Sequence, residues 1–197
     1  MKSTKLLIII LFLGFKASFA IDLIKPAKIQ YGFVENKGQI IDQFNQPNTA
    51  VLYKLSGKGL NVHLRQNSFS YEVVKKQVLP NTKNVDGKSL LSKTDSNSFE
   101  YNFHRIDISF VGSNPAPSII ADEPFEDYIN YYISNTNDKG IVKVQHFKKI
   151  TYQNIYKGID LKWYEKEGHL EYDYLVSAGA DYKQIQLEIK GADKITV

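Results

Sequence analysis

The sequence contains few side chains whose types and spacing could do chemistry, and its best carboxylate pair is Asp160 and Asp173. They lie on two alternating segments that flank the turn 165–168, and a hairpin with Tyr164 opposite His169 would set them directly across from each other. Two close carboxylates share a proton or bind a cation such as Ca²⁺. The alternative, which we favour, is two solvated carboxylates at a sheet edge, so Asp160 and Asp173 stay as the candidate metal ligands.

No recognisable catalytic constellation accompanies this pair. The chain has no cysteine, which excludes thiolate catalysis. It has no Gly-x-Ser-x-Gly turn and no glycine-rich phosphate loop, although a Ser-His-Asp triad could still assemble in space. The histidines are far apart and lack metal-ligand spacing, so each is predicted to be a solvent-facing strand residue: His63, His104, His146 and His169. We therefore predict no catalytic residue, no cofactor and no enzyme activity.

Tyrosines are the other candidates for a site, because flat aromatic faces stack on apolar surfaces such as the faces of sugar rings. The chain has 13 Tyr and 11 Phe, enough for both a core and a binding platform. The candidate ligand-stacking residues are Tyr128, Tyr131, Tyr132, Tyr156 and Tyr164. The alternative, which we favour, is that most of them pack in the core or between sheets.

Period-two alternation is the main signal for the elements that must position these side chains. Three alternating runs, 51–55, 60–64 and 69–73, are separated by short turns rich in Gly, Asn and Ser, which predicts a β-meander. The polar partners in these runs are expected to face water: Asn61, His63, Arg65, Ser70 and Glu72.

Two later segments refine the expected fold. A strand over 99–110 changes its apolar parity partway, and we interpret the change as a β-bulge near His104 and Arg105. The segments 159–164 and 169–176 form the hairpin described above. No stretch has helical periodicity, so the sequence predicts an all-β fold, an antiparallel β-sandwich or related two-sheet fold of about eight to ten short strands.

The beginning of the chain predicts export. Residues 1–20 read as a cleavable signal peptide, with a basic start, an apolar run of ten residues and small residues before a cleavage site after Ala20. The run is shorter than the roughly 20 residues of a membrane-spanning helix, and no second long apolar segment follows. We expect residues 21–197 to form a single β-sandwich-like domain with a mobile loop near 77–98. A domain boundary in this segment is the alternative to the loop. The C-terminal end is open to three interpretations: a truncated gene product, a fragment of a longer protein or a stand-alone copy.

The charge of the mature chain argues against one class of partner. Loss of the three lysines in residues 1–20 lowers the formal net charge from +4 to +1. No basic cluster with interleaved aromatics is present, so nucleic acid is not expected as a partner. Because cysteine is absent, stability must come from packing and not from disulfides.

Several strings in the sequence are similar to a known family. They are Phe33-Val34-Glu35-Asn36-Lys37-Gly38-Gln39, Gly57-Lys58-Gly59-Leu60, Asp127-Tyr128-Ile129-Asn130-Tyr131-Tyr132, Ile155-Tyr156-Lys157-Gly158-Ile159-Asp160-Leu161, Leu170-Glu171-Tyr172-Asp173-Tyr174 and Gly179-Ala180-Asp181. In order and spacing they resemble the uncharacterised N-terminal domain of bacterial SBBP-repeat (seven-bladed β-propeller) surface proteins. The resemblance implies export to the outside or the outer surface of a Gram-negative cell, with a β-propeller following in longer relatives. This sequence lacks propeller repeats and a sorting domain, and the family supplies no catalytic residues.

Three functions are compatible with these observations. The leading hypothesis is a non-enzymatic secreted or cell-surface accessory module that interacts with protein or glycan and stands ahead of a propeller. The alternatives are a carbohydrate-binding module using exposed Tyr or Trp, and a hydrolase domain with a spatially assembled carboxylate site. A coplanar aromatic row on the surface would favour sugar binding, whereas converging carboxylates beside a groove would favour hydrolysis.

Overall fold

Antiparallel strands dominate the computed structural model, which describes residues 32–57, 59–78, 99–132 and 139–196. The predicted signal peptide and all but the first two residues of the predicted loop near 77–98 lie outside these ranges. The strands are β1 (Phe33–Glu35), β2 (Tyr53–Gly57), β3 (Leu60–Leu64), β4 (Ser68–Val78), β5 (Phe99–Phe110), β6 (Ser118–Pro124), β7 (Ile129–Tyr131), β8 (Ile141–Val144), β9 (His146–Tyr156), β10 (Ile159–Lys166), β11 (His169–Val176) and β12 (Leu187–Lys190), with a 3₁₀ turn η1 (Tyr182–Gln184) before β12. The all-β prediction is confirmed.

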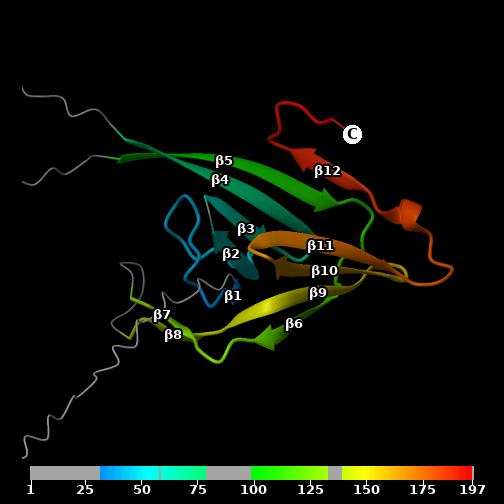
Figure 1. Cartoon of the computed structure of the whole chain (residues 1–197), viewed down its shortest axis with the longest axis horizontal. Helices are drawn as coiled ribbons and strands as arrows, with labels where there is room; N and C mark the ends of the chain where they lie inside the picture. The colour runs from blue at the N-terminus through cyan, green and yellow to red at the C-terminus, as the bar shows by residue number, and fades with distance from the viewer. Residues whose placement is uncertain (1–31, 58, 79–98, 133–138, 197) are drawn as a thin grey trace, which may run out of the picture. The chain divides into compact units, whose positions relative to one another are not determined.

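Ten of these strands form one antiparallel sheet, and β7 and β8 form a separate pair (Figure 1). The order along the large sheet is β11-β10-β9-β1-β2-β3-β4-β5-β12, and β6 also pairs with β9. Residues 149–152 of β9 pair with both β10 and β6, so these two strands lie on opposite edges of β9. The first residues of β9 pair instead with β1. Strand β9 therefore joins two halves of the sheet. One half consists of β6, β9, β10 and β11, and the other consists of β1, β2, β3, β4, β5 and β12.

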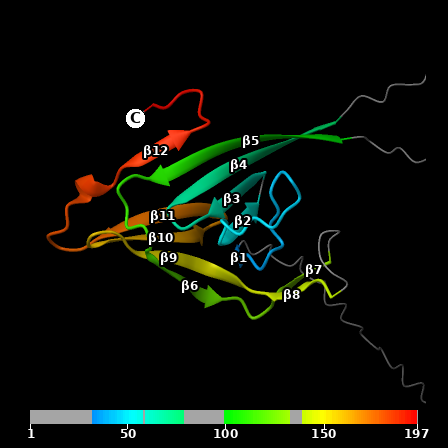
Figure 2. The same cartoon turned by 180° about the vertical axis from the view of Figure 1, so that it is seen from behind.

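The sheet curls so that its two halves share one interior, and Figure 2 shows the same arrangement from behind. Phe69 on β4 lies with its ring centroid 4.8 Å from that of Trp163 on β10, and Phe110 lies 6.2 Å from Tyr152 on β9. The Tyr152 hydroxyl donates a hydrogen bond of 2.7 Å to the carbonyl oxygen of Arg65, just beyond β3. Burial of these large aromatic side chains is the main stabilising contribution in a chain without disulfides.

The predicted meander is confirmed, but two of its polar residues do not face water. Strands β2, β3 and β4 pair in sequence, with Leu55 opposite Val62 and Leu64 opposite Phe69. His63 is only 8% exposed and Ser70 is fully buried, although both lie on the face opposite to the core. Residues 40–43 and Asn48 line a pocket together with His63, and the Arg65 guanidinium donates to the Ser70 hydroxyl, contacts that alternation along a strand does not reveal.

The β-bulge predicted near His104 and Arg105 is wrong. Strands β4 and β5 pair without interruption from Ser68 opposite Ser109 to Val78 opposite Phe99. The change of apolar parity therefore marks the point at which the apolar residues of β5 change from one face of the strand to the other. The inward face of β5 carries Ile106, Ile108 and Phe110, whereas Phe99, Tyr101 and Phe103 lie on its outer face and are 43%, 52% and 63% exposed.

The predicted β10–β11 hairpin exists, but its register is shifted by two residues. Lys166 pairs with His169 and Trp163 pairs with Tyr172. Glu167 and Gly168 have φ values of 53° and 82°, so they form a two-residue turn of the I′ type, where we expected a four-residue turn. A shift of two preserves which side chains face inward, because strand side chains alternate with period two.

Candidate functional site

The outer face of β3, β4 and β5 carries a pocket of about 550 Å³, which we call the outer-face pocket. One wall is formed by residues 40–43 and Asn48, and the floor consists of outward-facing side chains of β3, β4 and β5 and of Arg65, just beyond β3. Its lining residues are Ile40, Ile41, Asp42, Gln43, Asn48, His63, Arg65, Glu72, Phe103 and Arg105. Apolar and charged groups thus converge in a concave site, as is typical of ligand pockets.

The 33–39 string explains how the covering segment is held in place. The Asn36 amide donates to the carbonyl oxygens of Asn48 at 2.8 Å and Val51 at 2.7 Å. Its side-chain oxygen accepts from the backbone N–H of Gly38 at 2.9 Å, where φ is +105° and a residue with a side chain would be strained. Within the segment, Asp42 accepts backbone hydrogen bonds that close its turn. The wall of the pocket is therefore fixed by the same string that resembles a family motif.

Positive charge gathers on the floor of the pocket. Register places Lys54 opposite His63 and His63 opposite Ser70, so these groups form one row across β2, β3 and β4. The Arg65 guanidinium donates to the Ser70 hydroxyl at 3.0 Å. Arg105 lies on the neighbouring strand β5 and completes the cluster.

The pKa values reflect this crowding of cationic groups. Burial, and then repulsion from Lys54, lowers the pKa of His63 from its usual 6.5 to about 4. Burial also lowers the pKa of Arg65, and the charge of Arg105 lowers it further. Burial lowers the pKa of Lys54, against an opposing effect of Glu72. His63 is therefore neutral at neutral pH, and the arginines remain charged.

The carboxylates near the pocket are already engaged by neighbouring donors. Glu72 accepts a hydrogen bond of 2.8 Å from the Asn61 amide. Asp107 accepts from the Nε and Nη2 atoms of Arg105 at 2.9 and 2.6 Å. In the described part of the chain, the side chain of Arg65 has no comparable carboxylate partner at ion-pair distance. The pocket thus presents donors that a ligand could engage.

This arrangement is better suited to holding a ligand than to transferring protons. A general base works best with a pKa near the operating pH, and a pKa of about 4 makes His63 a weak base at pH 7. Ser70 is fully buried, and its hydroxyl oxygen accepts from Arg65. A neutral imidazole still offers one donor and one acceptor for hydrogen bonding.

An aromatic row leads along β5 to the pocket. Phe99, Tyr101 and Phe103 occupy alternate positions on the outer face, and Phe103 forms part of the pocket wall. Lys76 on β4 lies opposite Tyr101, with its Nζ atom 3.5 Å from the Phe99 ring centroid. Sequence reasoning missed this row because it placed these aromatics in the core by inserting a bulge. The switch of apolar parity could itself have identified the row, if no inserted residue had been assumed in this strand.

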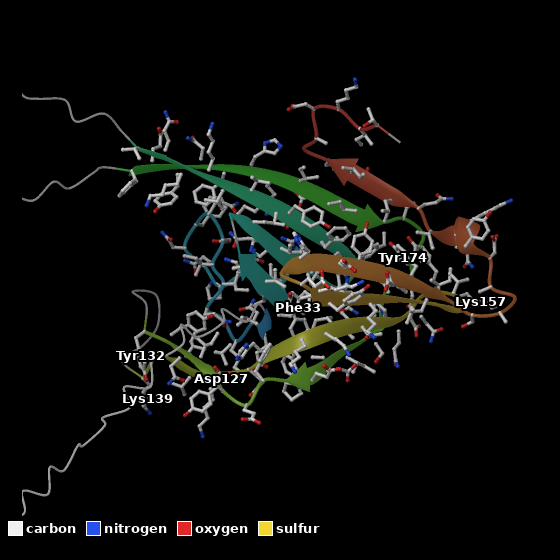
Figure 3. All side chains as sticks on the ribbon, in the orientation of Figure 1. Phe33, Asp127, Tyr132, Lys139, Lys157 and Tyr174 are labelled. Atoms are coloured by element: carbon white, nitrogen blue, oxygen red, sulfur yellow. The ribbon has the colours of Figure 1, made fainter. Side chains whose placement is uncertain are left out.

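The tyrosines expected to stack on a ligand do not lie together. Tyr156 is 3% exposed and its hydroxyl donates to the carbonyl oxygen of Gln186 at 3.0 Å, so its assignment as an exposed platform residue is wrong. Tyr128 and Tyr132 are 53% and 70% exposed and flank β7, and Tyr131 is half-buried. Figure 3 places Tyr132 beside the β7–β8 pair, together with Asp127.

The fifth tyrosine, Tyr164, belongs to a hydrogen-bonded cluster on the outer face of β10 and β11. Its hydroxyl donates to Asp173 at 2.7 Å and contacts Glu171 at 3.1 Å. The hydrogen bond to Asp173 is the main reason that the pKa of Tyr164 rises to about 12. The hydrogen bonds of its hydroxyl, and not a ring face open for stacking, therefore account for the position of Tyr164.

The two candidate metal ligands are not directly opposed. Asp160 pairs with Leu175, and Asp173 pairs with Lys162, because the hairpin register differs from the expected one. Asp160 instead accepts a 2.7 Å hydrogen bond from the backbone N–H of Asn154, where the β9–β10 register shifts. In the ranges that the structure describes, no three acidic or histidine side chains are grouped as a metal ion would require.

Two histidines depart from the solvent-facing prediction. Besides His63, His146 is 8% exposed and stacks on Phe125 with ring centroids 4.3 Å apart. Its Nε2 atom lies 2.8 Å from an oxygen of Asp127, so the 127–132 string anchors the start of β9. His104 and His169 are exposed as predicted. A side chain at Gly32 would collide with the Phe125 and His146 rings, so this glycine leaves room for the stacked pair.

Comparison with known proteins identifies one family. A family model described as a domain of unknown function, DUF7948, matches residues 33–197. No curated protein and no solved structure matches the chain. Among the described residues, no helix is long and apolar enough to span a membrane. The matched range contains every strand of the fold and the complete outer-face pocket.

Proposed function

The chain belongs to this family of domains of unknown function, DUF7948, and we propose that it is a non-enzymatic binding module that works outside the cytoplasm. The observation that carries the proposal is the outer-face pocket, in which a neutral His63 and the charged Arg65 and Arg105 converge on a rigid sheet. Groups held by strands present a preformed binding surface. None of them is tuned to act as a base near pH 7.

Export and domain context form part of the same proposal. Residues 1–20 have the order of a signal peptide, and the strings quoted above resemble domains that stand ahead of β-propellers in bacterial surface proteins. We therefore place the module on the outside or the outer surface of a Gram-negative cell. A reading frame that continues past Val197 into repeats would support the propeller context.

The test is binding to cell-envelope material. The exported protein, purified from the medium or envelope of an expressing Gram-negative host, should bind an envelope fraction saturably and should release no cleavage product that mass spectrometry detects. Absence of saturable binding to every envelope fraction would contradict the proposal. Cleavage of an envelope polymer that is abolished by Glu72→Gln would replace it with a hydrolase.

A carbohydrate-binding function is a second candidate with its own supporting observation. Phe99, Tyr101 and Phe103 form an exposed aromatic row on one strand face, which is the feature expected of a sugar platform. The row consists of residues other than the tyrosines that the sequence suggested. This candidate specifies the ligand class of the binding module.

A further inference from the structure

The aromatic row and the outer-face pocket are continuous along β5. Same-face residues on a strand are about 6.7 Å apart, because each residue advances the chain by about 3.3–3.4 Å. Phe99, Tyr101 and Phe103 are therefore followed at the same interval by Arg105. Apolar ring faces and a cation thus lie at regular spacing along one exposed strand face.

We propose that the aromatic row and the outer-face pocket together bind an acidic polysaccharide, a chain of sugar rings that carry carboxylates. The proposal rests on the function proposed above, that the chain is a binding module, and it names the ligand class. Sugar rings would stack on Tyr101 and Phe103, and a ring carboxylate would enter the pocket toward Arg65, beside Arg105, whose Nε and Nη2 atoms already donate to Asp107. Guanidinium groups bind carboxylates with paired N–H donors.

The mixed character of the pocket favours a sugar over a simple anion. Glu72 and the neutral His63 lie beside the arginines and can hydrogen-bond sugar hydroxyls. Ile40 and Ile41 add an apolar wall opposite the row. A ligand with charge only would gain little from these groups.

Charge on the face also matches this ligand and disfavours nucleic acid. Lys54, Arg65, Lys76 and Arg105 provide four cations, against the carboxylates of Asp42, Glu72 and Asp107. A nucleic-acid strand carries a phosphate at every nucleotide and needs a continuous basic groove. The interspersed carboxylates leave this face without such a groove, whereas sugar hydroxyls can donate hydrogen bonds to them.

The experiment is isothermal titration calorimetry on the exported protein with matched oligosaccharides. Polygalacturonate oligomers carry the carboxylates, galactan oligomers of the same length lack them, and polyphosphate has charge without sugar rings. Saturable binding of the polygalacturonate oligomers, with markedly weaker binding of the other two, is the expected result. Equal binding of polyphosphate would overturn the proposal, because charge alone would then explain the affinity.

Variants separate the two parts of the site. Arg65→Met should weaken polygalacturonate binding by about tenfold or more, with partial recovery in Arg65→Lys, because one charge-assisted contact is lost. Tyr101→Ala combined with Phe103→Ala should weaken polygalacturonate and galactan alike by about tenfold or more, by loss of ring contact. Lys149→Met on the β9 outer face is the matched control and should change neither. An equal loss in the control would contradict the location.

Folding and the underlying function are checked separately. The far-UV circular dichroism of each variant must match the parent, and both ring positions are exposed, so their removal leaves the core intact. If the exported protein binds envelope fractions but no acidic oligosaccharide, this inference fails and the proposed binding function survives. If it binds neither, both fail.

Discussion

The two outer faces of the curled sheet are both polar, but they treat their charges differently. On the β9–β11 face, Lys149 forms an ion pair with Glu123, and the Tyr164 hydroxyl donates to Asp173. Lys162 lies directly opposite Asp173 in the register. These are neighbouring groups that satisfy one another, as solvated sheet faces commonly do.

On the β2–β5 face, Arg105 forms an ion pair with Asp107, but further cations gather beside it. Lys54, Arg65 and Arg105 surround the neutral His63, and residues 40–48 partly enclose them. Alternation of polar and apolar residues along a strand is enough to produce a polar face. A site forms where a second segment, here 40–48, partly covers that face. The second layer desolvates the charges, and desolvated donors can bind a ligand more strongly than solvated ones.

The largest effect is expected where the two halves of the sheet meet. Phe69 is 2% exposed and contacts both Trp163 and Tyr172, so Phe69→Ala should lower the free energy of unfolding by about 3–5 kcal/mol. Urea denaturation followed by fluorescence of Trp163, the single tryptophan, measures it. Phe69→Leu should cost less. A loss below about 1 kcal/mol for the alanine variant would show that the halves do not share one interior.

The next largest loss of stability is expected from releasing segment 40–48, which distinguishes the two faces. Asn36→Ala removes the hydrogen bonds to Asn48 and Val51 and should lower the free energy of unfolding by about 2–3 kcal/mol. Ligand binding at the outer-face pocket should also weaken, because its wall is released. Gln153→Ala, at an exposed position on β9, is the control and should be neutral. Unchanged stability and binding in the Asn36 variant would contradict this role.

A smaller effect is expected from titration of His63, which Lys54, Arg65, Glu72 and Arg105 influence. Its folded pKa of about 4 lies below the usual 6.5, so between these values the unfolded chain binds a proton that the folded protein does not. The free energy of unfolding should therefore fall as pH decreases from 6.5 to 4. The expected loss is about 1–2 kcal/mol after allowance for solvent screening.

The control for this titration is His63→Gln, which removes the ionisable group. Urea denaturation at several pH values should show a flatter pH dependence for the variant than for the parent. Parallel curves for the two proteins would mean that folding leaves the pKa of His63 at its usual value, and that the neighbouring cations of the pocket do not lower it.

The smallest effect is expected on the opposite face. Tyr164→Phe removes the hydroxyl that donates to Asp173, but Asp173 is exposed and its carboxylate remains in water. The urea midpoint of the variant should stay within error of the parent, and its absorbance titration should lack one tyrosine with a pKa of about 12 that the parent shows. A clear loss of stability would show that this cluster is structural in the same way as the covered face.

The sequence predicted the strands well, because alternation is local. The meander and the inward positions of Trp163 and Leu161 follow from period-two spacing alone. The hairpin register did not, since turn length decides it, and Glu167-Gly168 turned in two residues where four were assumed. That shift separated Asp160 from Asp173 and removed the direct opposition on which their candidacy as a metal pair was based.

The site itself was harder to predict, because it depends on contacts between segments far apart in the chain. Residues 40–48 show no strong pattern, yet part of this segment lies beside His63, which was expected at the surface and is buried. The aromatic row was visible as a parity switch at Phe103, but assuming that apolar residues must face the core led to a bulge. Exposed aromatics on a strand are an exception to that assumption and mark a surface available for binding.

The most direct test of the difference between the faces is an NMR titration of the exported ¹⁵N-labelled protein with polygalacturonate oligomers. We expect saturable shifts in the backbone amides of β3, β4 and β5 around Tyr101, Phe103 and Arg105, and none around Tyr164 and Asp173. Shifts centred on β9–β11 instead, or spread evenly over both faces, would contradict the assignment of function to the covered face.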